Sequence, residues 1–302
     1  MVVNRTTNLF FYKSIISVDF RVGGSSMDKG VEFSVLMSVY KKENPDYLKV
    51  ALDSVFNQTF KPSDVVLVED GELTHELEKV IADYEKKYKE LNVIRFKENR
   101  GLGPALNDGI VRCKNNYVAR VDTDDECEKN RFECQIKYLI NNPEVDVVGC
   151  NMNEYDADLK NVISIKSVPE HHNDIKKYLK KRNPINHPTV MYKKDKVLEV
   201  KGYEDYKYFE DYYLWAKMMK NGCIFYNIQE NLYKFRAGSS MFQRRGGIKY
   251  LRCISNFEKG LYDLKIINRF EQYRNLLSRF AISLCPNFVR ESIYKKMLRR
   301  VK

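Results

Sequence analysis

The chain has 302 residues, of which 43% are hydrophobic, 31% charged and 13% aromatic, with only 14 Gly and 8 Pro. This composition excludes collagen-like and low-complexity chains, and it argues against wholesale disorder. The formal net charge of +11 comes entirely from residues 244–302, which carry 15 Lys and Arg against 4 Asp and Glu, so residues 1–243 are neutral as a whole.

Residues 1–26 precede any clear hydrophobic periodicity. Lys13 and Asp19 interrupt the apolar core that a signal peptide needs. Nowhere does the chain approach the ~20 consecutive apolar residues of a membrane-spanning helix. Because regular patterning begins only after Met27, we expect residues 1–26 to be an N-terminal extension that neither the fold nor the activity needs.

Residues 27–150 alternate short apolar segments with amphipathic ones. The predicted strands are Phe33–Tyr40, Val65–Glu69, Val93–Phe96, Tyr117–Val121 and Val145–Cys150, and the predicted helices cover residues 45–56, 77–88, 104–113 and 131–140. Asn44 followed by Pro45 is a typical helix start. Strands that alternate with helices predict crossover connections and a mostly parallel α/β sheet, which binds ligands at the carboxyl ends of its strands.

The pattern becomes less regular after residue 150. Further apolar segments occur at Val162–Val168, Ile175–Leu179, Met191, Phe209–Met219 and Ile224–Ile228, and from Arg244 onward the pattern is helical and basic. We therefore expect one domain over residues 27–243, with halves at 27–150 and 151–243. Residues 244–302 would form a basic helical extension.

The residues that end the predicted strands are the first candidates for a site. They are Ser38 to Tyr40, Glu69 and Asp70, and Asp122 to Asp125. The three carboxylates of Asp122, Asp124 and Asp125 repel one another unless a cation neutralises them, and hard oxygen ligands suit Mg²⁺ or Mn²⁺. The alternative is a solvated acidic turn that caps the helix beginning near Arg131.

Seven cysteines, an odd number, occur without a Cys-x-x-Cys pair. We therefore expect free, mostly buried thiols in a reducing compartment, rather than disulfides or a zinc site. Gly101-Leu102-Gly103 is a weak dinucleotide motif, because it does not follow the first strand and lacks a third glycine. A turn into the next helix explains it better.

Several motifs occur in a fixed order along residues 33–240. They are SVLMSVY with the helix after it, VVLVEDG, ENRGLGPALNDGI, ARVDTDD and FEDYYLW. In this order they resemble the family 2 glycosyltransferases, and VEDG, NHPTVM and FEDYYLW look most like bacterial capsule and exopolysaccharide transferases of the amylovoran type. The resemblance implies a GT-A type, Rossmann-like fold and a nucleotide-sugar substrate. One motif alone would be weak, but several in order are specific.

The resemblance implies a role for the residues at the strand ends. Five of them, together with Arg100, would bind the nucleotide-sugar: Ser38, Tyr40, Asp70, Asp122 and Thr123. Tyr40 would stack on the uracil face, while Ser38 and Asp70 would hydrogen-bond the base edge. An ordinary core position is the alternative for Tyr40.

The resemblance also assigns residues to the ribose and the diphosphate of the donor. By resemblance, Asp122 would hold the ribose, and Arg100 would contact the base or the diphosphate. Asp124 and Asp125 would present Mn²⁺ or Mg²⁺ to the diphosphate, and the sequence leaves open which of the two ligates directly. The alternative for Arg100 is an ion pair with Asp108.

Asp211, with Glu210 beside it, is the candidate catalytic base. It lies among Phe209, Tyr212 and other aromatic residues, which would raise its pKa and strengthen it as a base. It would take the proton from an acceptor hydroxyl, and the single displacement would invert the anomeric configuration. The alternative is a carboxylate placed at a helix N-terminus by the macrodipole.

Three further residues are candidates for the acceptor or diphosphate. His187 precedes a predicted strand, and a structural histidine is the alternative reading. Arg244 and Arg245 stand where processive relatives carry Gln-x-x-Arg-Trp, a motif that this chain lacks. The sequence therefore argues against a polymerising synthase, and the two arginines would either bind a diphosphate or form a basic loop.

The C-terminal segment 293–301 predicts a basic amphipathic helix. Such a helix would lie on anionic lipid, and a helix packed on the domain with a solvated basic face is the alternative. The resemblance implies an enzyme that moves sugar from a UDP-sugar to a lipid-linked saccharide, and with the basic helix we expect it at the cytoplasmic face of the cell membrane. A non-catalytic nucleotide-binding module of the same fold is the alternative. No nucleic-acid partner is expected, because such proteins more often spread basic residues over the folded domain.

Overall fold

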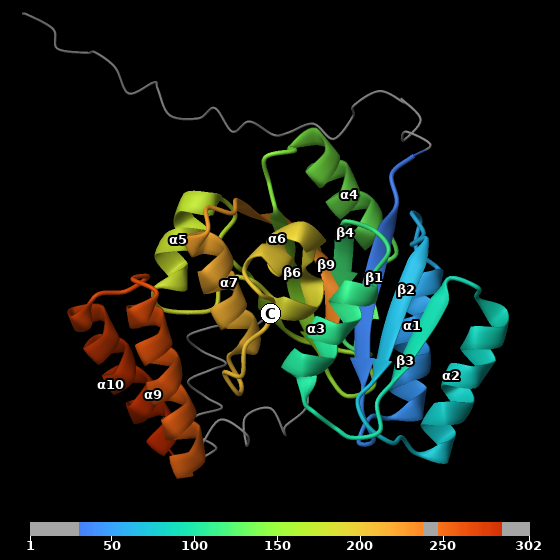
Figure 1. The fold of residues 1–302 in the computed structure, drawn as a ribbon, viewed down its shortest axis with the longest axis horizontal. Coiled ribbons are helices and arrows are strands. Elements are labelled where there is room, and N and C mark those ends of the chain that lie inside the picture. The colour runs from blue at the N-terminus through green and yellow to red at the C-terminus, as the bar shows by residue number, and fades with distance from the viewer. Residues whose placement is uncertain (1–29, 238–246, 286–302) are drawn as a thin grey trace, which may run out of the picture. The chain divides into compact units, whose positions relative to one another are not determined.

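The computed structural model describes residues 30–237 and 247–285 (Figure 1). Internal contacts divide the chain into Met1–Val31 and Glu32–Lys302, and the second unit holds every helix and strand that is described. The predicted extension 1–26, Arg244, Arg245 and the predicted amphipathic segment 293–301 lie outside the described residues.

The second unit is built on a mixed sheet whose first part is parallel. Its strands are β1 (Phe33–Val39), β2 (Asp64–Glu69), β3 (Leu91–Arg95), β4 (Tyr117–Arg120), β5 (Glu126–Cys127), β6 (Val147–Tyr155), β7 (Val162–Lys166), β8 (Met191–Lys193) and β9 (Phe225–Arg236). Among the described residues they run in the order β3-β2-β1-β4-β8-β6-β9-β5, with β7 paired to β6. Strands β3, β2, β1 and β4 are parallel, whereas β8 pairs antiparallel with both β4 and β6.

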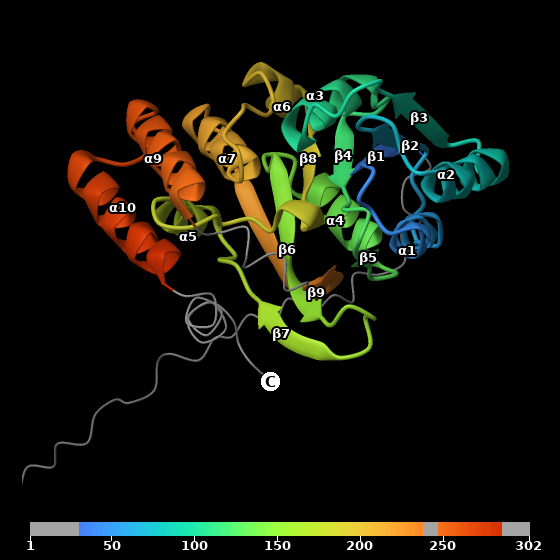
Figure 2. The same ribbon diagram turned by 90° about the horizontal axis from the view of Figure 1, so that it is seen from below.

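Helices cover both faces of this sheet. They are α1 (Pro45–Phe56), α2 (His75–Lys87), α3 (Leu102–Arg112), α4 (Arg131–Asn141), α5 (His172–Leu179), α6 (Lys194–Glu199), α7 (Glu210–Lys220), α9 (Gly247–Asp263) and α10 (Arg269–Leu284), with a 3₁₀ turn, η1, at His187–Thr189. Helices α3, α6 and α7 lie on one face, and α1 and α4 on the other (Figures 1 and 2). The α/β fold class expected from the sequence is confirmed.

Local chemistry explains where the elements begin and end. Helix α1 starts where predicted, because the Asn44 side chain accepts a hydrogen bond from the Asp46 N–H at 2.8 Å. Helix α3 begins at Leu102, two residues before the predicted start, with Gly101 as its N-cap at a φ of +92°. Pro104 is tolerated inside the first turn because the N–H groups there have no helical partner.

The register of the parallel strands brings their carboxyl ends to one edge. Val39 pairs with Glu69 across β1 and β2, and Leu36 pairs with Arg120 across β1 and β4. The residues that follow β1, β2 and β4 therefore leave the sheet side by side, as the parallel topology predicts.

Helix α9 shares the hydrophobic core of the sheet. Phe257 and Ile254 belong to the same buried cluster as Leu36, Val118 and Trp215. The predicted boundary after residue 243 stays a prediction, although this helix packs on the domain before it. The seven cysteines are all within the described residues and are free thiols, as expected. Within the described residues, every helix is too short or too polar to cross a bilayer.

Helix α3 approaches the sheet closely at Gly109. A Cβ there would lie 2.4 Å from Leu36 Cδ1 and 2.9 Å from Val68 Cγ2, both in the buried core. Gly109→Ala should therefore lower the free energy of unfolding by about 1–3 kcal/mol through overpacking. Urea denaturation measures this, and Val111→Ala on the exposed side of the same helix is the control. Equal stability of the two variants would contradict this packing.

Candidate functional site

Three carboxylates converge directly after β4. Ligand oxygens of Asp122, Asp124 and Asp125 all lie within 4.8 Å of one another. Asp125 is fully buried, and its Oδ1 accepts a hydrogen bond from the backbone N–H of Arg236 at 2.7 Å. Its Oδ2 is buried without a hydrogen-bond partner among the described residues. An orphaned carboxylate oxygen inside an acidic cluster fits a cation ligand.

Burial and mutual repulsion control the protonation of this cluster. Burial, then the charges of Asp122 and Glu43, raise the pKa of Asp124 to about 7. Burial, then Asp124 and Asp122, raise the pKa of Asp125 well above its ordinary value. A divalent cation would remove this repulsion, and the all-oxygen donor set suits Mg²⁺ or Mn²⁺.

Two residues that the sequence did not single out hold the cluster in place. Arg236 ends β9, and its Nε donates to the Asp124 carbonyl at 2.8 Å while its guanidinium lies 3.7 Å from the centre of the Tyr47 ring. Glu43 accepts a hydrogen bond from Thr123 Oγ1 at 2.8 Å, and Thr123 also donates to the Ser38 carbonyl at 3.2 Å. Glu43 could have been found from the sequence, because it lies just beyond the end of a predicted strand. Arg236 could not, because its place beside the cluster depends on long-range strand pairing.

Arg120 places a buried positive charge beneath the acidic cluster. Only 2% of its side chain is exposed, and it forms an ion pair with Asp122. Its Nε and Nη1 have no hydrogen-bond partner among the described residues. The same charge adds to the effect of burial in lowering the pKa of His187, and it opposes the rise that burial causes in the pKa of Asp211. Arg120 therefore acts electrostatically on candidate residues from both halves of the chain.

Tyr40 and Asp70, which are predicted to bind the uracil of the donor, lie at the ends of β1 and β2. Tyr40 is 41% exposed, so the alternative of a core tyrosine is wrong. Asp70 holds the loop before α3, because its two carboxylate oxygens accept from the backbone N–H groups of Arg100 at 2.7 Å and Gly101 at 2.9 Å. The Arg100 side chain forms the alternative ion pair with Asp108.

The candidate base lies at the start of α7. Asn183 Nδ2 donates to Asp211 Oδ2 at 2.6 Å. Burial raises the pKa of Asp211, while the Tyr212 N–H and Asn183 oppose that shift. Burial, with a smaller contribution from Asp211, raises the pKa of Glu210 to about 6. A Cβ at Gly103 would lie 3.7 Å from Glu210 Cγ, so the starts of α3 and α7 meet.

His187 begins η1 beneath the same region. Its Nε2 lies 2.9 Å from the Tyr203 hydroxyl. Burial, then the charge of Arg120, holds the pKa of His187 well below its ordinary value, so the ring is neutral at pH 7. A neutral ring with one nitrogen engaged is compatible both with a role at the acceptor or diphosphate and with a structural histidine.

Comparison with known proteins identifies the family. The family model for glycosyl transferase family 2 matches residues 34–199. A UDP-Gal:alpha-D-GlcNAc-diphosphoundecaprenol beta-1,3-galactosyltransferase from Escherichia coli is 37% identical over 273 residues, which cover 90% of this chain and 98% of that protein. The amylovoran biosynthesis glycosyltransferase AmsE from Erwinia amylovora is 38% identical over 268 residues, which cover 87% of this chain and 98% of that protein.

A solved structure shows the same fold. S. aureus TarS 1-349 in complex with UDP-GlcNAc matches with a TM-score of 0.60 at 19% identity, over 89% of this chain and 77% of that one. This likeness confirms the expected GT-A type architecture. The motifs, the fold and the sequence relatives agree, and the chain is a glycosyltransferase that belongs to glycosyl transferase family 2.

Proposed function

We propose that this enzyme is a metal-dependent, inverting transferase. It moves one sugar from a UDP-sugar to a lipid-linked saccharide during the synthesis of a capsule, exopolysaccharide or O-antigen. The observation that carries the proposal is the Asp122–Asp124–Asp125 cluster, at the edge where the parallel strands end. Within it, Asp125 is fully buried and one of its carboxylate oxygens has no hydrogen-bond partner among the described residues. The name of the Escherichia coli relative, with its UDP-Gal donor and diphosphoundecaprenol acceptor, supports the substrate classes.

On the donor side, Tyr40 has an exposed ring for the uracil face, with Ser38 and Asp70 beside it at the strand ends. Asp122 holds the ribose, and Asp124 and Asp125 hold Mn²⁺ or Mg²⁺. When bound, this cation neutralises negative charge on the departing diphosphate. Arg100 would have to leave Asp108 to contact the diphosphate, since the two side chains are paired here.

On the acceptor side, Asp211 removes the proton from the acceptor hydroxyl. The acceptor oxygen forms the new bond to the anomeric carbon, and the electron pair of the breaking bond leaves with UDP. The raised pKa of Asp211 makes it a stronger base than an exposed aspartate. Glu210 lies beside it and orients the acceptor or Asp211, while His187 lies near the acceptor. One displacement inverts the configuration.

Removing a metal ligand should uncouple UDP release from the metal. Mn²⁺ should stimulate UDP release by the native enzyme and raise its melting temperature. Asp124→Asn takes one charge from the cluster, so both responses should be lost in this variant. Asp158→Asn, at an exposed loop carboxylate, is the matched control. Undiminished stimulation in Asp124→Asn would contradict the assignment.

Removing the base should separate binding from transfer. Asp211→Asn keeps the shape and the Asn183 contact region but cannot accept a proton, so the transfer rate should fall by about 10²–10⁴-fold. The affinity for UDP and Mn²⁺ should stay unchanged, as measured by calorimetry. Normal turnover in this variant would refute the proposed base. A native protein that binds UDP-sugars but never releases UDP would instead indicate the non-catalytic module.

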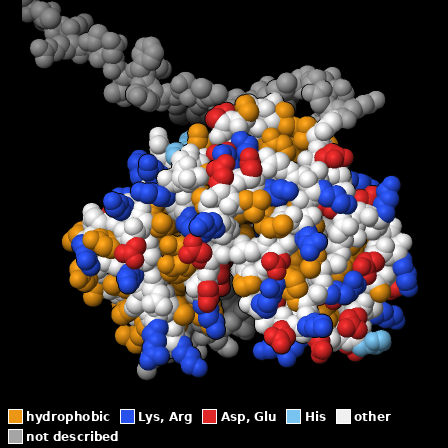
Figure 3. Space-filling view, viewed as in Figure 1, with side chains coloured by type: hydrophobic (Ala, Val, Ile, Leu, Met, Phe, Trp, Pro, Cys, Tyr) orange, Lys and Arg blue, Asp and Glu red, His pale blue; other side chains and the backbone are white. Residues whose placement is uncertain are grey.

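We also propose peripheral contact with an anionic membrane, made in part by α10. Four large apolar side chains on this helix are 61% to 76% exposed: Phe270, Tyr273, Leu277 and Leu284. Their spacing gives one apolar stripe. Hydrophobic side chains gather at the left of Figure 3, where α10 lies, with Lys and Arg around them. A basic region with an apolar stripe suits anionic lipid.

Polar substitutions in this stripe should weaken membrane binding. The double substitution Phe270→Ser and Leu277→Ser should lower the affinity for phosphatidylglycerol-containing vesicles by about tenfold or more. The reason is that two apolar side chains that would be buried in the lipid are lost. Vesicle sedimentation measures this, with Val111→Ser on exposed α3 surface as the control. Equal binding by the two proteins would count against α10 as the contact surface.

A further inference from the structure

Helices α9 and α10 form an antiparallel pair, the α9–α10 hairpin, that lies beside α7 and α5 (Figures 1 and 2). The two residues of the Asn183–Asp211 hydrogen bond come from different segments. Asn183 lies in the loop after α5, and Asp211 lies at the start of α7. The hairpin contacts both segments.

The first contact is aromatic and flanks Asp211. The rings of Phe209 and Phe257 stack with centroids 4.4 Å apart and planes 10° from parallel. Phe257 lies on α9 and is fully buried, and its ring also packs 4.6 Å from that of Tyr212. The residues two before and one after Asp211 are thus fixed against the hairpin.

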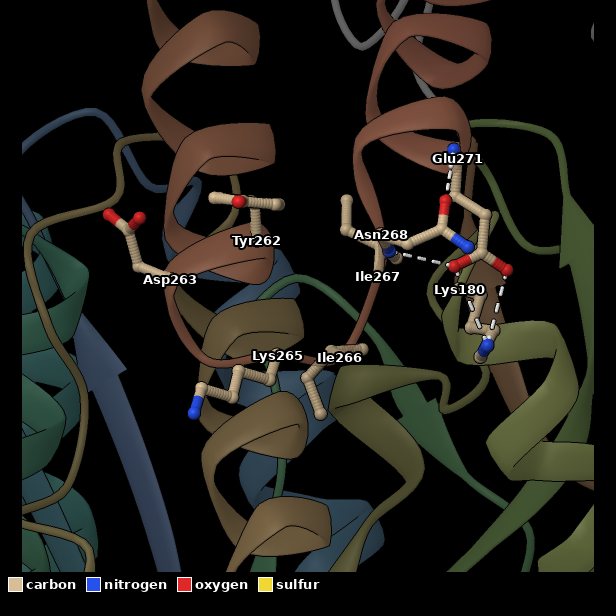
Figure 4. Close-up of a pocket in the computed structure, with 8 residues that line it drawn as sticks. All are labelled: Lys180, Tyr262, Asp263, Lys265, Ile266, Ile267, Asn268 and Glu271. Carbon is tan, nitrogen blue, oxygen red and sulfur yellow. Dashed lines mark hydrogen bonds and ion pairs between the residues drawn. The ribbon is translucent and has the colours of Figure 1, made fainter.

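The second contact fixes the loop that carries Asn183. From α10, Asn275 Nδ2 donates to the Lys180 carbonyl at 2.8 Å, and Arg279 Nη2 donates to the Lys181 carbonyl at 3.1 Å. Near the turn of the hairpin, Lys180 Nζ pairs with Glu271 at 3.1 Å beside a cavity of about 490 Å³ (Figure 4). Three side chains of α10 therefore hold the chain just before Asn183.

Arg279 joins the two contacts. Its Nε forms an ion pair with Glu258 Oε1 at 2.8 Å, and Glu258 is fully buried on α9. The Arg279 guanidinium lies 5.6 Å from the centre of the Phe209 ring and 5.7 Å from that of Tyr212. Because burying an ion pair costs desolvation, such a pair is weak evidence for stability. Its contacts with both segments therefore matter more here than its own strength.

We propose that the α9–α10 hairpin positions Asp211 for proton transfer, with Arg279 and Asn183 as positioning residues. The proposal rests on the proposed role of Asp211 as the base. Arg279 fixes the two segments relative to each other, and Asn183 then directs the carboxylate by its hydrogen bond. Loss of either should impair transfer more than donor binding, because small misplacement of a reacting group costs rate.

The pH profile gives a readout that general destabilisation would not produce. Burial raises the pKa of Asp211, and the Tyr212 N–H, the Asn183 hydrogen bond, Lys166 on β7 and Arg120 on β4 oppose that rise. Glu210 and Tyr203 are titratable groups that also interact with Asp211. Without the Asn183 donor, the pKa of Asp211 should rise. Because the base must be ionised, the acidic limb of the kcat/KM profile should then move to higher pH.

The test compares Arg279→Met, Arg279→Lys and Asn183→Ala in the full chain, with Arg252→Met at an exposed position of α9 as the control. Arg279→Met should lower kcat by about 10- to 100-fold with unchanged affinity for UDP and Mn²⁺. Arg279→Lys, which keeps the charge near Glu258, should recover part of the rate. Asn183→Ala should lower kcat and shift the acidic limb upward.

The outcomes separate this inference from the proposed function. If Asp211→Asn turns over normally, the base assignment itself fails. If Asp211→Asn is inactive but Arg279→Met and Asn183→Ala keep native kcat and pH profiles, the positioning inference is overturned while the base stands. Should Arg279→Met fail to fold, Arg279→Lys tests the hairpin in its place, because it keeps the charge near Glu258 but loses the guanidinium contacts, and native kcat in Arg279→Lys would then overturn the role of the hairpin. Asn183→Ala, at a partly exposed loop position, tests the hydrogen bond to Asp211 independently.

Discussion

Mutual repulsion among the carboxylates that follow β4 is the constraint on which the site depends. Negative charges this close, of which that of Asp125 is fully buried, need compensation from fixed donors, from protons or from a cation. The protein supplies part of it through Arg120 below the cluster and the backbone N–H of Arg236 beside it. The parallel register delivers these carboxylates to the edge where Tyr40 and Asp70 also emerge. Fold and charge thus specify the same place.

Arg120 makes this electrostatic balance common to the two halves of the chain. Its charge pairs with Asp122 and also stabilises the ionised form of Asp211. A buried guanidinium with unpartnered donors is costly in isolation, and the surrounding carboxylates offset that cost. The nucleotide-binding and acceptor-binding functions that we propose therefore share the positive charge of Arg120, which lies on strand β4 of the central sheet and not on a loop.

Local patterns predicted what depends on local chemistry. The cap at Asn44 and the acidic run after β4 follow from residue types and spacing, and the order of strands and helices follows from periodicity. The contacts of Arg236 and Asn183 were not predictable, because they arise when β9 pairs with β5 and when the loop after α5 meets α7. The exposure of Tyr40 likewise required the register of β1, since an apolar run alone does not show where burial stops.

The shared core of α7 and α9 has a practical consequence for anyone who trims this protein. The family match ends at residue 199, before Asp211, and the charge-based division ends at residue 243, before α9. A fragment cut at either point would lose the aromatic partner of Phe209 and Tyr212, or those residues themselves. Recombinant fragments and fusion junctions should therefore follow the end of α10, at Leu284, because the shared hydrophobic core extends beyond the family segment.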